Sequence, residues 1–434
     1  MSCKILVVSQ LFEPQNEIGA LRPTKFVKLL SEKGYDIDVF TSADTLVNAD
    51  YRPSGFNIIY DRERNSPGNS IRADSRHCIS SSEDKRKNTG KGILKLLRQE
   101  IAMTYRQILA FQNGSSFLEH FKVAIKLGRL DMGKYQCVFT TFGPVGSVLV
   151  GMYIKKYYSH IKWINDFRDP MVSQIMPKLF HPLYGYLQAK SLRMCDSAVT
   201  VSEGYYRRMV RSTNAFKFHV IPNGYDKKDA QFFEGILPDK DKLSFVYVGS
   251  LYEGKRDISP VFSALRQLCD EGYIRKEQII FHYAGRDAAY LQQQAQVHQM
   301  EEVVFNHGMI SRQECLKLQA ASRFLVLSTW NDRGEEGVFP GKFIEYMLID
   351  RPIIAVVDGN LAHSEVTATI QQYNLGVSLE KANPATKGQL YEWLKMQARC
   401  FCTGQAAAFT PDRNGIDAKY NWINIVKRFG ELIE

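Results

Sequence analysis

The stretch from Gly337 to Tyr346, GVFPGKFIEY, combines a possible anion-binding helix start with a carboxylate that can hydrogen-bond to hydroxyl groups. Apolar residues recur at helical spacing after Gly341, so we expect a helix opened by Phe339 and Gly341 whose first free amides can face a diphosphate. Lys342 and Glu345 are three residues apart and share one helical face. The lysine would lie beside the phosphates, and Glu345 one turn further in, where it can accept hydrogen bonds from ribose hydroxyls. The pattern suggests an enzyme that uses a nucleotide-linked sugar; the alternative is a surface helix with a solvated ion pair.

A second group of polar side chains directly follows an apolar strand, in the sequence WINDFRDP from Trp163 to Pro170. In parallel α/β sheets, ligands bind beyond the carboxyl ends of the strands. Asp166, Arg168 and Asp169 stand at such an end, where they can orient sugar hydroxyls or a phosphate, the arginine through its planar fork. The alternative is that Arg168 pairs with Asp166 or Asp169 and pins the loop.

Each half of the chain also has a glycine-containing loop after its first strand. In the C-terminal half this loop, GSLYEGKR, ends in Lys255 and Arg256, two cations that could clamp a pyrophosphate. A solvated surface pair is the alternative for these cations. In the N-terminal half, Gly19 and Arg22 occupy the corresponding loop, where a missing side chain lets the backbone approach a ligand.

Apolar runs and helical periods alternate along the chain in two series, each typical of a doubly wound parallel sheet. The first series predicts strands at 5–8, 37–40, 137–141, 161–164, 198–201 and 218–221, with a long loop at 61–92. The second predicts strands at 245–248, 279–283, 303–305, 324–327 and 353–357. A capping-box pattern from Ser311 to Glu314 opens one helix of the second series. We therefore expect an α/β protein with two Rossmann-like domains that face each other across a cleft.

The expected domain boundaries follow from this alternation. The N-terminal domain spans 1–225 and contains a basic insertion at about 61–130. A charged linker follows at 226–243, and the C-terminal domain spans 244–415. An amphipathic helix within 416–434 closes the chain.

The composition is that of an ordinary globular protein. With 434 residues, 44% of them hydrophobic and 24% charged, the chain is long enough for two cores. Its eight cysteines are scattered, and the closest pair, Cys400 and Cys402, has neither zinc nor redox spacing, so we expect a reduced, cytoplasmic protein. We find no signal-peptide core and no clean apolar run of about 18 residues, which predicts neither secretion nor a membrane span.

The formal net charge of +10 favours an anionic partner. Basic residues concentrate from Lys85 to Arg106, where interleaved apolar residues make an amphipathic helix of the kind that lies on anionic lipid. We therefore weigh peripheral attachment to the inner face of the cytoplasmic membrane against a helix packed on its own domain with a solvated basic edge. No nucleic-acid motif combines basic and aromatic residues, so nucleic acid is not the expected partner.

Several enzyme classes lack their motifs. The sequence contains no GxxxxGK[ST], HExxH or GxSxG, and no GxGxxG follows the first strand. The nine histidines show no metal-ligand spacing, so we expect neither a metal nor another cofactor.

Taken together, these motifs resemble the family-4 retaining glycosyltransferases of the GT-B fold, especially members that build bacterial capsule, exopolysaccharide or O-antigen chains. The resemblance runs from Lys4 to Pro352. It is carried in order by IGALR at 18–22 with GYDIDV at 34–39, WINDFRDP at 163–170, VTVS at 199–202 with VIPNG at 220–224, FVYVGSLY at 245–252 with Lys255, and PGKFIEY at 340–346.

The resemblance implies transfer of a sugar from a nucleotide diphosphate donor to a hydroxyl of a glycan or lipid-linked acceptor. It implies donor-binding roles for Gly249, Ser250, Lys255, Arg256, Phe339, Gly341, Lys342 and Glu345. It places Asp166, Arg168, Asp169 and Lys255 at the reacting centre, and Gly19, Arg22, Thr141 and Glu336 on the acceptor or sugar side. Retention without a protein nucleophile would fit a front-face route, in which the leaving phosphate helps to deprotonate the acceptor.

Three positions depart from the family pattern. Ser250 stands where the family usually has an arginine, which leaves Lys255 and Arg256 to hold the phosphates. Gly337 replaces the first of two glutamates seven residues apart, with Glu336 one position earlier. The loop at 140–144, TTFGP, contains no histidine to carry over. Two alternatives therefore stay open, a sugar-nucleotide epimerase of the same architecture and a non-catalytic member that binds nucleotide or glycan.

Overall fold

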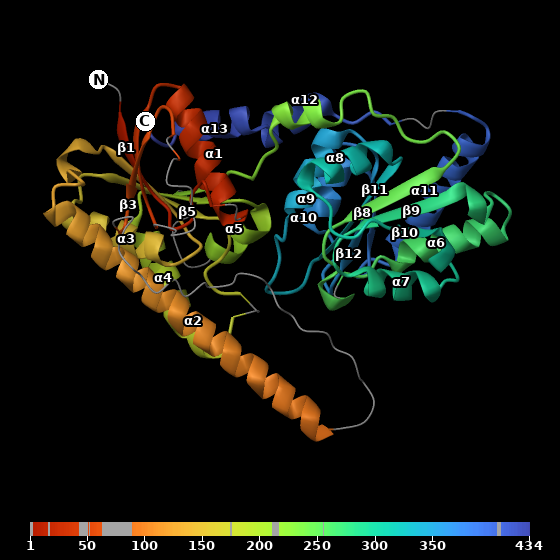
Figure 1. Cartoon of the computed structure of the whole chain (residues 1–434), viewed down its shortest axis with the longest axis horizontal. Helices are drawn as coiled ribbons and strands as arrows, with labels where there is room; N and C mark the ends of the chain where they lie inside the picture. The colour runs from red at the N-terminus through yellow and green to blue at the C-terminus, as the bar shows by residue number, and fades with distance from the viewer. Residues whose placement is uncertain are drawn as a thin grey trace. The chain divides into compact units, whose positions relative to one another are not determined.

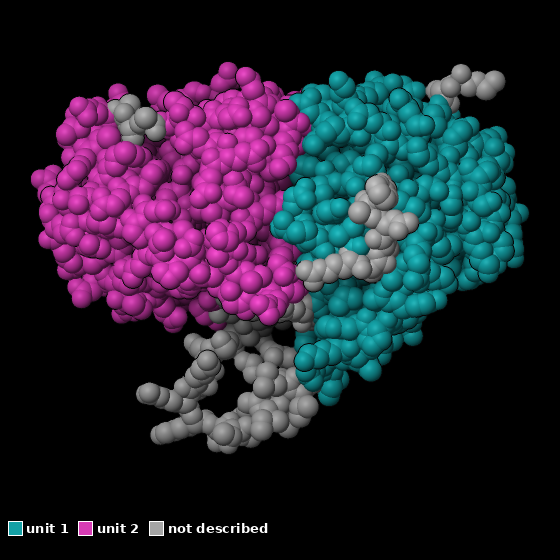
Figure 2. Space-filling model, turned by 180° about the vertical axis from the view of Figure 1, so that it is seen from behind, with its two compact units in different colours: residues 1–77, 84–223, 422–434 teal, residues 78–83, 224–421 magenta. Residues whose placement is uncertain are grey.

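The computed structural model describes residues 3–15, 18–42, 51, 53–62, 89–173, 176–210, 217–254, 256–405 and 409–434. These residues form two compact units, coloured teal and magenta in Figure 2. Unit 1 comprises the described residues before Gly224 together with Trp422–Glu434, and unit 2 comprises those of Gly224–Asn421. The chain thus returns to unit 1 after completing unit 2.

Unit 1 is built on a seven-stranded sheet in which every neighbouring pair is parallel. Its strands are β1 (Lys4–Val8), β2 (Asp36–Thr41), β3 (Asn57–Tyr60), β4 (Cys137–Thr141), β5 (Lys162–Phe167), β6 (Ser197–Thr200) and β7 (Phe218–Val220). Their order, β3-β2-β1-β4-β5-β6-β7, starts in the middle and winds outward in both directions. Six of these strands are predicted by apolar runs, whereas the short edge strand β3 lies in a region without a clear period.

The helices of unit 1 cover both faces of this sheet, as Figure 1 shows. They are α1 (Ile18–Glu32), α2 (Thr89–Lys126), α3 (Gly146–Tyr157), α4 (His181–Met194), α5 (Glu203–Val210) and α13 (Trp422–Gly430). Alternate residues of β1 serve two cores, since Ile5 and Val7 pack with α1 and α13 while Leu6 and Val8 pack with α2 and α3. The buried, continuously apolar strands are those expected of a sheet covered on both faces.

The closing helix α13 is held to unit 1 by aromatic contacts. The Phe429 ring lies 4.3 Å from that of Phe26 and 4.8 Å from that of Phe139, and the Trp422 ring lies 5.9 Å from Phe26. These rings bury large apolar area around the middle of the sheet. The predicted closing helix is present from Trp422, whereas residues 416–420 of the predicted range belong to a separate helix, α12 (Arg413–Tyr420), and Asn421 lies between the two.

Unit 2 is a second parallel sheet, of six strands in the order β10-β9-β8-β11-β12-β13. The strands are β8 (Leu243–Val248), β9 (Ile279–Ala284), β10 (Val304–Asn306), β11 (Phe324–Trp330), β12 (Ile353–Asp358) and β13 (Gly376–Glu380). Its helices are α6 (Ser259–Asp270), α7 (Ala288–Gln296), α8 (Arg312–Ala321), α9 (Gly341–Ile349), α10 (Glu365–Gln372), α11 (Ala385–Cys402) and α12. Strand β13, at the sheet edge, is the one that the sequence patterns do not predict.

Two local predictions in unit 2 are confirmed. Ser311 and Glu314 form the capping box at the start of α8, each side chain accepting from the other's backbone amide. Helix α9 begins at Gly341, and the apolar residues that follow are buried against β11 and β12. In the part of the chain that the structure describes, no helix combines the length and the apolar character that a membrane span requires.

We expect unit 2 to lose stability in mild acid because of a histidine pair on β9 and the end of β10. The His307 and His282 rings are joined by a 3.0 Å contact between Nε2 and Nδ1. Burial, and secondarily the charge of His307, lowers the pKa of His282 from 6.5 to about 4. Below about pH 6.5 the unfolded chain therefore binds a proton that the folded chain does not, so stability falls as pH falls. The melting temperature at about pH 5 should rise relative to that at about pH 7.5 when His282 is replaced by Gln; an unchanged pH dependence in that variant would contradict the assignment.

Candidate active site

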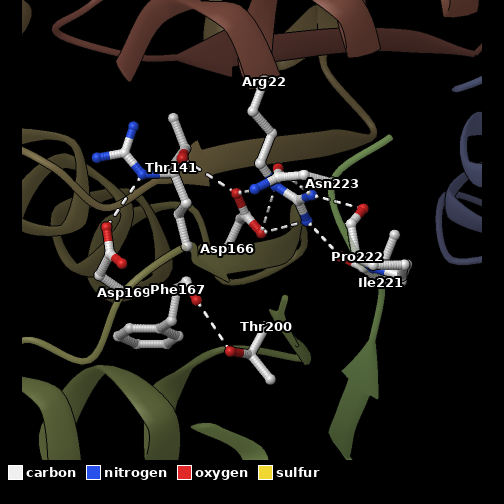
Figure 3. A network of polar contacts seen from close by, with 10 residues as sticks. Arg22, Thr141, Asp166, Phe167, Asp169, Thr200, Ile221, Pro222 and Asn223 are labelled. Carbon is white, nitrogen blue, oxygen red and sulfur yellow. Dashed lines mark hydrogen bonds and ion pairs between the residues drawn. The ribbon is translucent and has the colours of Figure 1, made fainter. Parts of the chain in front are cut away.

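In unit 1, the strongest polar network at the carboxyl edge of the sheet joins Arg22 of α1 to Asp166 at the end of β5. Figure 3 shows the two side chains pointing toward each other, and their Nη2 and Oδ1 atoms are 2.9 Å apart. Arg22 also donates through Nε to Asp166 and through Nη1 and Nη2 to the carbonyl oxygens of Pro222 and Ile221 and the side chain of Asn223. Both charged groups are buried, at 2% and 0% side-chain exposure.

The hydrogen-bonding groups of this buried pair are paired within the protein. All five N–H groups of Arg22 have acceptors among these partners, and Thr141 donates to Asp166 Oδ2 at 3.0 Å. A buried pair is tolerated only when its remaining hydrogen-bonding capacity is filled, as it is here. The contacts of Arg22, Thr141 and Asp166 tie α1, β4 and β5 to the segment just before Gly224, which makes them positioning residues for the loop that follows β5.

The side chains of Arg168 and Asp169, on that loop, are more exposed to solvent than those of Arg22 and Asp166. Arg168 Nε donates to Asp169 Oδ2 at 3.1 Å, with side-chain exposures of 22% and 54%. The sequence left open whether Arg168 pairs with Asp166 or Asp169, and the structure pairs it with Asp169. A methyl group placed on Gly19 would come within 3.1 Å of Arg168 Nη1, and one on Gly143 within 3.1 Å of Nη2. Gly143 also has φ +110°, so both glycines leave the room that the guanidinium occupies.

In unit 2, the loop after β8 is fixed by the carboxylate of Asp287, which follows the neighbouring strand β9. Ser250 Oγ donates to Asp287 Oδ2 at 2.6 Å, and the Leu251 amide donates to the same oxygen at 2.7 Å. Gly249 has φ +130°, and apart from its chain neighbours no atom of the described residues lies within 4 Å of where its Cβ would be. Ser250 therefore shapes the loop, and Gly249 leaves its surface open. Asp287 was not predicted as a site residue, although it follows the end of β9.

The Arg256 side chain contacts this same loop. Its Nη1 donates to the Ser250 carbonyl at 3.1 Å, and its guanidinium carbon lies 4.5 Å from the Tyr252 ring centroid and 5.6 Å from that of Trp330. Its Nε is buried and has no acceptor in the described parts of the chain. Such a donor is costly to leave unpaired. Lys255, the second predicted clamp, lies outside the described residues.

A polar cluster that the sequence patterns do not predict holds Asp257, the residue after Arg256. Lys381 Nζ lies 2.8 Å from Asp257 Oδ2 and also pairs with Asp358, whose Oδ2 accepts from the Asp257 amide. Burial raises the pKa of the Asp358 carboxyl, and the Lys381 ammonium opposes this only in part. Burial also acts to raise the pKa of Asp257, but hydrogen bonds from Lys381 and Ser259 bring it below its ordinary value. The cluster joins the ends of β12 and β13 to the residue after Arg256.

Lys342 and Glu345 share one face of α9, as their spacing predicts, and they form an ion pair there. Lys342 Nζ lies 3.1 Å from Glu345 Oε1, which also accepts from Gln319 Nε2 at 3.0 Å, and Arg312 Nε lies 3.8 Å from Oε2. The ion pair of the alternative is therefore present, but it is not fully solvated, since the side chains of Glu345 and Lys342 are 14% and 35% exposed. Gln319 and Arg312, both on α8, fix the carboxylate and leave Oε2 with capacity for another donor.

The first turn of α9 is uncapped and open. Pro340 occupies the N-cap position without a side-chain hydrogen bond, and apart from the adjacent helix backbone no atom of the described residues lies within 4 Å of a Cβ placed on Gly341. Phe339 instead packs against Tyr420 and Phe343, at ring distances of 5.8 and 5.0 Å, and so fixes the approach to the helix. The amides of Gly341 and Lys342 can therefore receive an anion.

Glu336 lies on the loop between β11 and α9. Its Oε2 accepts from the Gly334 amide at 2.9 Å, while Glu335 accepts from Trp330 Nε1 at 2.9 Å. Since β8 and β11 are neighbours in the sheet, Arg256, Trp330 and the loop to α9 belong to one edge of unit 2. Within the described residues, no group of three metal-binding side chains occurs at this edge or elsewhere.

Comparison with known proteins gives similarity at the level of structure. No family model matches the sequence, and no curated protein matches it. The sucrose-phosphate synthase of Thermosynechococcus elongatus matches with a TM-score of 0.61 at 15% identity, covering 99% of this chain and 98% of that one. The lipopolysaccharide outer core galactosyltransferase WaaB matches with a TM-score of 0.54 at 14% identity, covering 99% of both chains.

A third match is an E. coli structure described as trehalose-6-phosphate bound with UDP-2-fluoro glucose. Its TM-score is 0.59 at 12% identity, covering 100% of this chain and 99% of that one. Full-length matches of this kind, together with the two parallel Rossmann-like sheets, show that the chain has the α/β GT-B fold. The predicted fold class is thereby confirmed.

Proposed function

We propose that this protein transfers a sugar from a nucleoside diphosphate donor to a hydroxyl of a glycan or lipid-linked acceptor, with retention. The observation that carries the proposal is the composition of one edge of unit 2. There, Arg256 with its unpaired buried Nε, the uncapped first turn of α9 and the half-enclosed Glu345 follow neighbouring strands β8 and β11. A diphosphate and a ribose need these three kinds of group.

The donor would be held through charge and through hydroxyl recognition. Arg256 and Lys255 would stabilise the negative charge that grows on the departing diphosphate, and the amides of Gly341 and Lys342 would share it. Glu345 would accept hydrogen bonds from ribose hydroxyls through Oε2, because Lys342 and Gln319 already occupy Oε1. Phe339 and Ser250 would act indirectly, since they shape the two loops that carry these groups.

The acceptor side would lie in unit 1. Arg168 and Asp169 are the partly exposed charged groups of the loop after β5, and they would orient the acceptor or the transferred sugar. Arg22, Thr141 and Asp166 would hold that loop in place through their buried network. Glu336 would take the sugar-reading role of the missing family glutamate. In a front-face route the leaving phosphate would remove the acceptor proton, which needs no protein nucleophile.

The biological setting that we propose is bacterial surface polysaccharide synthesis in the cytoplasm. The resemblance of WINDFRDP and PGKFIEY to the polysaccharide subgroup supports it. The described cysteines form no disulfide, as expected of a reducing compartment. Lipid-linked acceptors are used at the inner face of the cytoplasmic membrane, where a cationic protein is favoured electrostatically.

Release of nucleoside diphosphate, measured with and without acceptor, tests this function. We expect release that depends on acceptor and falls by roughly a hundredfold in Glu345→Gln, since one neutralised carboxylate loses its charge-assisted hydrogen bonds. Glu119→Gln is the matched control, because Glu119 also pairs with a lysine three residues away, Lys122, at 2.6 Å. Epimerised sugar formed without acceptor would support the epimerase alternative instead. Binding without any turnover would support the non-catalytic one.

A further inference from the structure

Helix α2 carries an exposed apolar stripe. Ile101, Tyr105 and Ile108 follow one another at spacings of four and three residues, so they share one helical face. Their side chains are 68%, 59% and 41% exposed. Figure 1 shows this N-terminal part of α2 running beyond the sheet that its C-terminal part covers. Three neighbouring apolar side chains left in water at one face need an explanation beyond the packing of unit 1.

The stripe lies opposite the face by which α2 packs. Gly114, Phe117, Phe121 and Ala124 have the same spacing and are buried. At about 100° per residue, Phe117 is turned roughly half a circle away from Ile108. The exposed stripe is therefore not the frayed edge of the core but a separate surface.

A second stripe with the same spacing lies on a neighbouring segment, with its first residue in the short helix Lys178–Phe180 just before α4 and the other two on α4. Leu179, Leu183 and Tyr186 are 77%, 38% and 56% exposed. This segment is joined to α2 because the Tyr184 ring packs 6.4 Å from that of Phe111. We refer to these two triplets together as the α2–α4 surface.

Most charges within the two segments that carry the α2–α4 surface are positive, although Glu119, Asp169 and Asp196 border them. Residues 170–195 contain no acid, and Lys178 and Arg193 are exposed. In residues 98–118 of α2, exposed Arg98 and Arg106 stand against Glu100 alone. Apolar and aromatic side chains flanked by cations are the pattern of elements that lie in the interface of an anionic bilayer.

We propose that the α2–α4 surface docks on an anionic lipid bilayer. Apolar side chains would enter the headgroup region, while the arginine and lysine side chains would reach the lipid phosphates. A second copy of the chain fits less well, because a symmetric contact would set the same cations against each other. The proposal narrows the basic amphipathic segment from Lys85 to Arg106 to the stripe from Ile101 to Ile108 and adds the second stripe, while Lys85 to Lys87 lie outside the described residues. It also does not rest on the proposed sugar transfer.

Flotation of the purified full chain with vesicles tests the docking surface. We expect binding to vesicles of phosphatidylcholine and phosphatidylglycerol in equal parts, and much weaker binding to phosphatidylcholine alone. Replacing Ile101, Tyr105 and Ile108 by Ser should lower the partition coefficient by roughly tenfold or more. The control replaces Val297 and Met309 of unit 2 by Ser, since these are 74% and 78% exposed. Neither variant should change the melting temperature, because every substituted side chain is on the surface.

Each other outcome overturns the proposal. Absence of wild-type binding to the mixed vesicles would do so, as would equal binding by the stripe variant and wild type. A wild-type dimer in light scattering that becomes a monomer in the stripe variant, without any vesicle affinity, would assign the surface to self-association instead.

Discussion

We expect Arg256→Ala to lower kcat/KM for sugar transfer by about a hundredfold or more, the effect typical of removing one group that stabilises transition-state charge. The Arg256 guanidinium is held in place by the Ser250 carbonyl and by the Tyr252 and Trp330 rings, and its Nε has no acceptor among described residues. The loss should appear mainly in kcat if the contact strengthens as the diphosphate departs. Steady-state kinetics with saturating acceptor measure it.

Two control variants separate charge from structure. Arg256→Lys keeps a cation without the planar fork and should recover only part of the rate. Arg266→Ala removes a surface arginine of unit 2 that pairs with Asp270 at 2.9 Å, and should leave kinetics unchanged. Equal kcat/KM in Arg256→Ala and wild type, with both proteins folded, would remove Arg256 from the donor site.

The second large effect is on stability. Arg22→Ala should lower the free energy of unfolding of unit 1 by about 3–5 kcal/mol, because it leaves the Asp166 carboxylate buried without its partner. The carbonyl oxygens of Ile221 and Pro222 would lose their donors as well. Urea unfolding followed by fluorescence measures this change.

A double substitution checks that the loss comes from the unpaired charge. Arg22→Met with Asp166→Leu removes both charges and should be less destabilising than the sum of the two single changes. Strictly additive single effects, or a loss below about 1 kcal/mol in Arg22→Ala, would contradict a coupled buried pair.

The sequence predicts those parts of the fold that leave a local pattern. The continuously apolar strands at the centre of each sheet, the capping box at Ser311 and the Lys342–Glu345 pair are all present. In each case the signal lies within a few residues, where spacing alone decides which side chains meet. The edge strands β3 and β13 escape prediction because runs of only four and five residues are too short for their period to distinguish a strand from a loop.

Pairings between distant residues could not be predicted in the same way. Arg22 and Asp166 were both named as ligand-facing candidates, yet they lie 144 positions apart and bind each other. Asp287 and Lys381 were not named, although they fix the loop after β8 and the residue after Arg256. Each follows a strand end, and only the strand order β9-β8-β11-β12-β13 brings these ends to one edge. Polar residues soon after a predicted strand are thus a signal that could have found Asp287, whereas Lys381 follows β13, which the sequence patterns do not predict.

The most direct test of the account is equilibrium binding of UDP-, GDP-, ADP- and dTDP-sugars and their free diphosphates to the wild-type chain and to Glu345→Ala. Calorimetric titration or the shift in melting temperature reports it, because a ligand of the folded state raises its stability. We predict selective binding of one nucleotide series by the wild type and a loss of at least about tenfold in affinity in the variant. No binding of any diphosphate by the wild type, with acceptor present or absent, would contradict the donor site in unit 2.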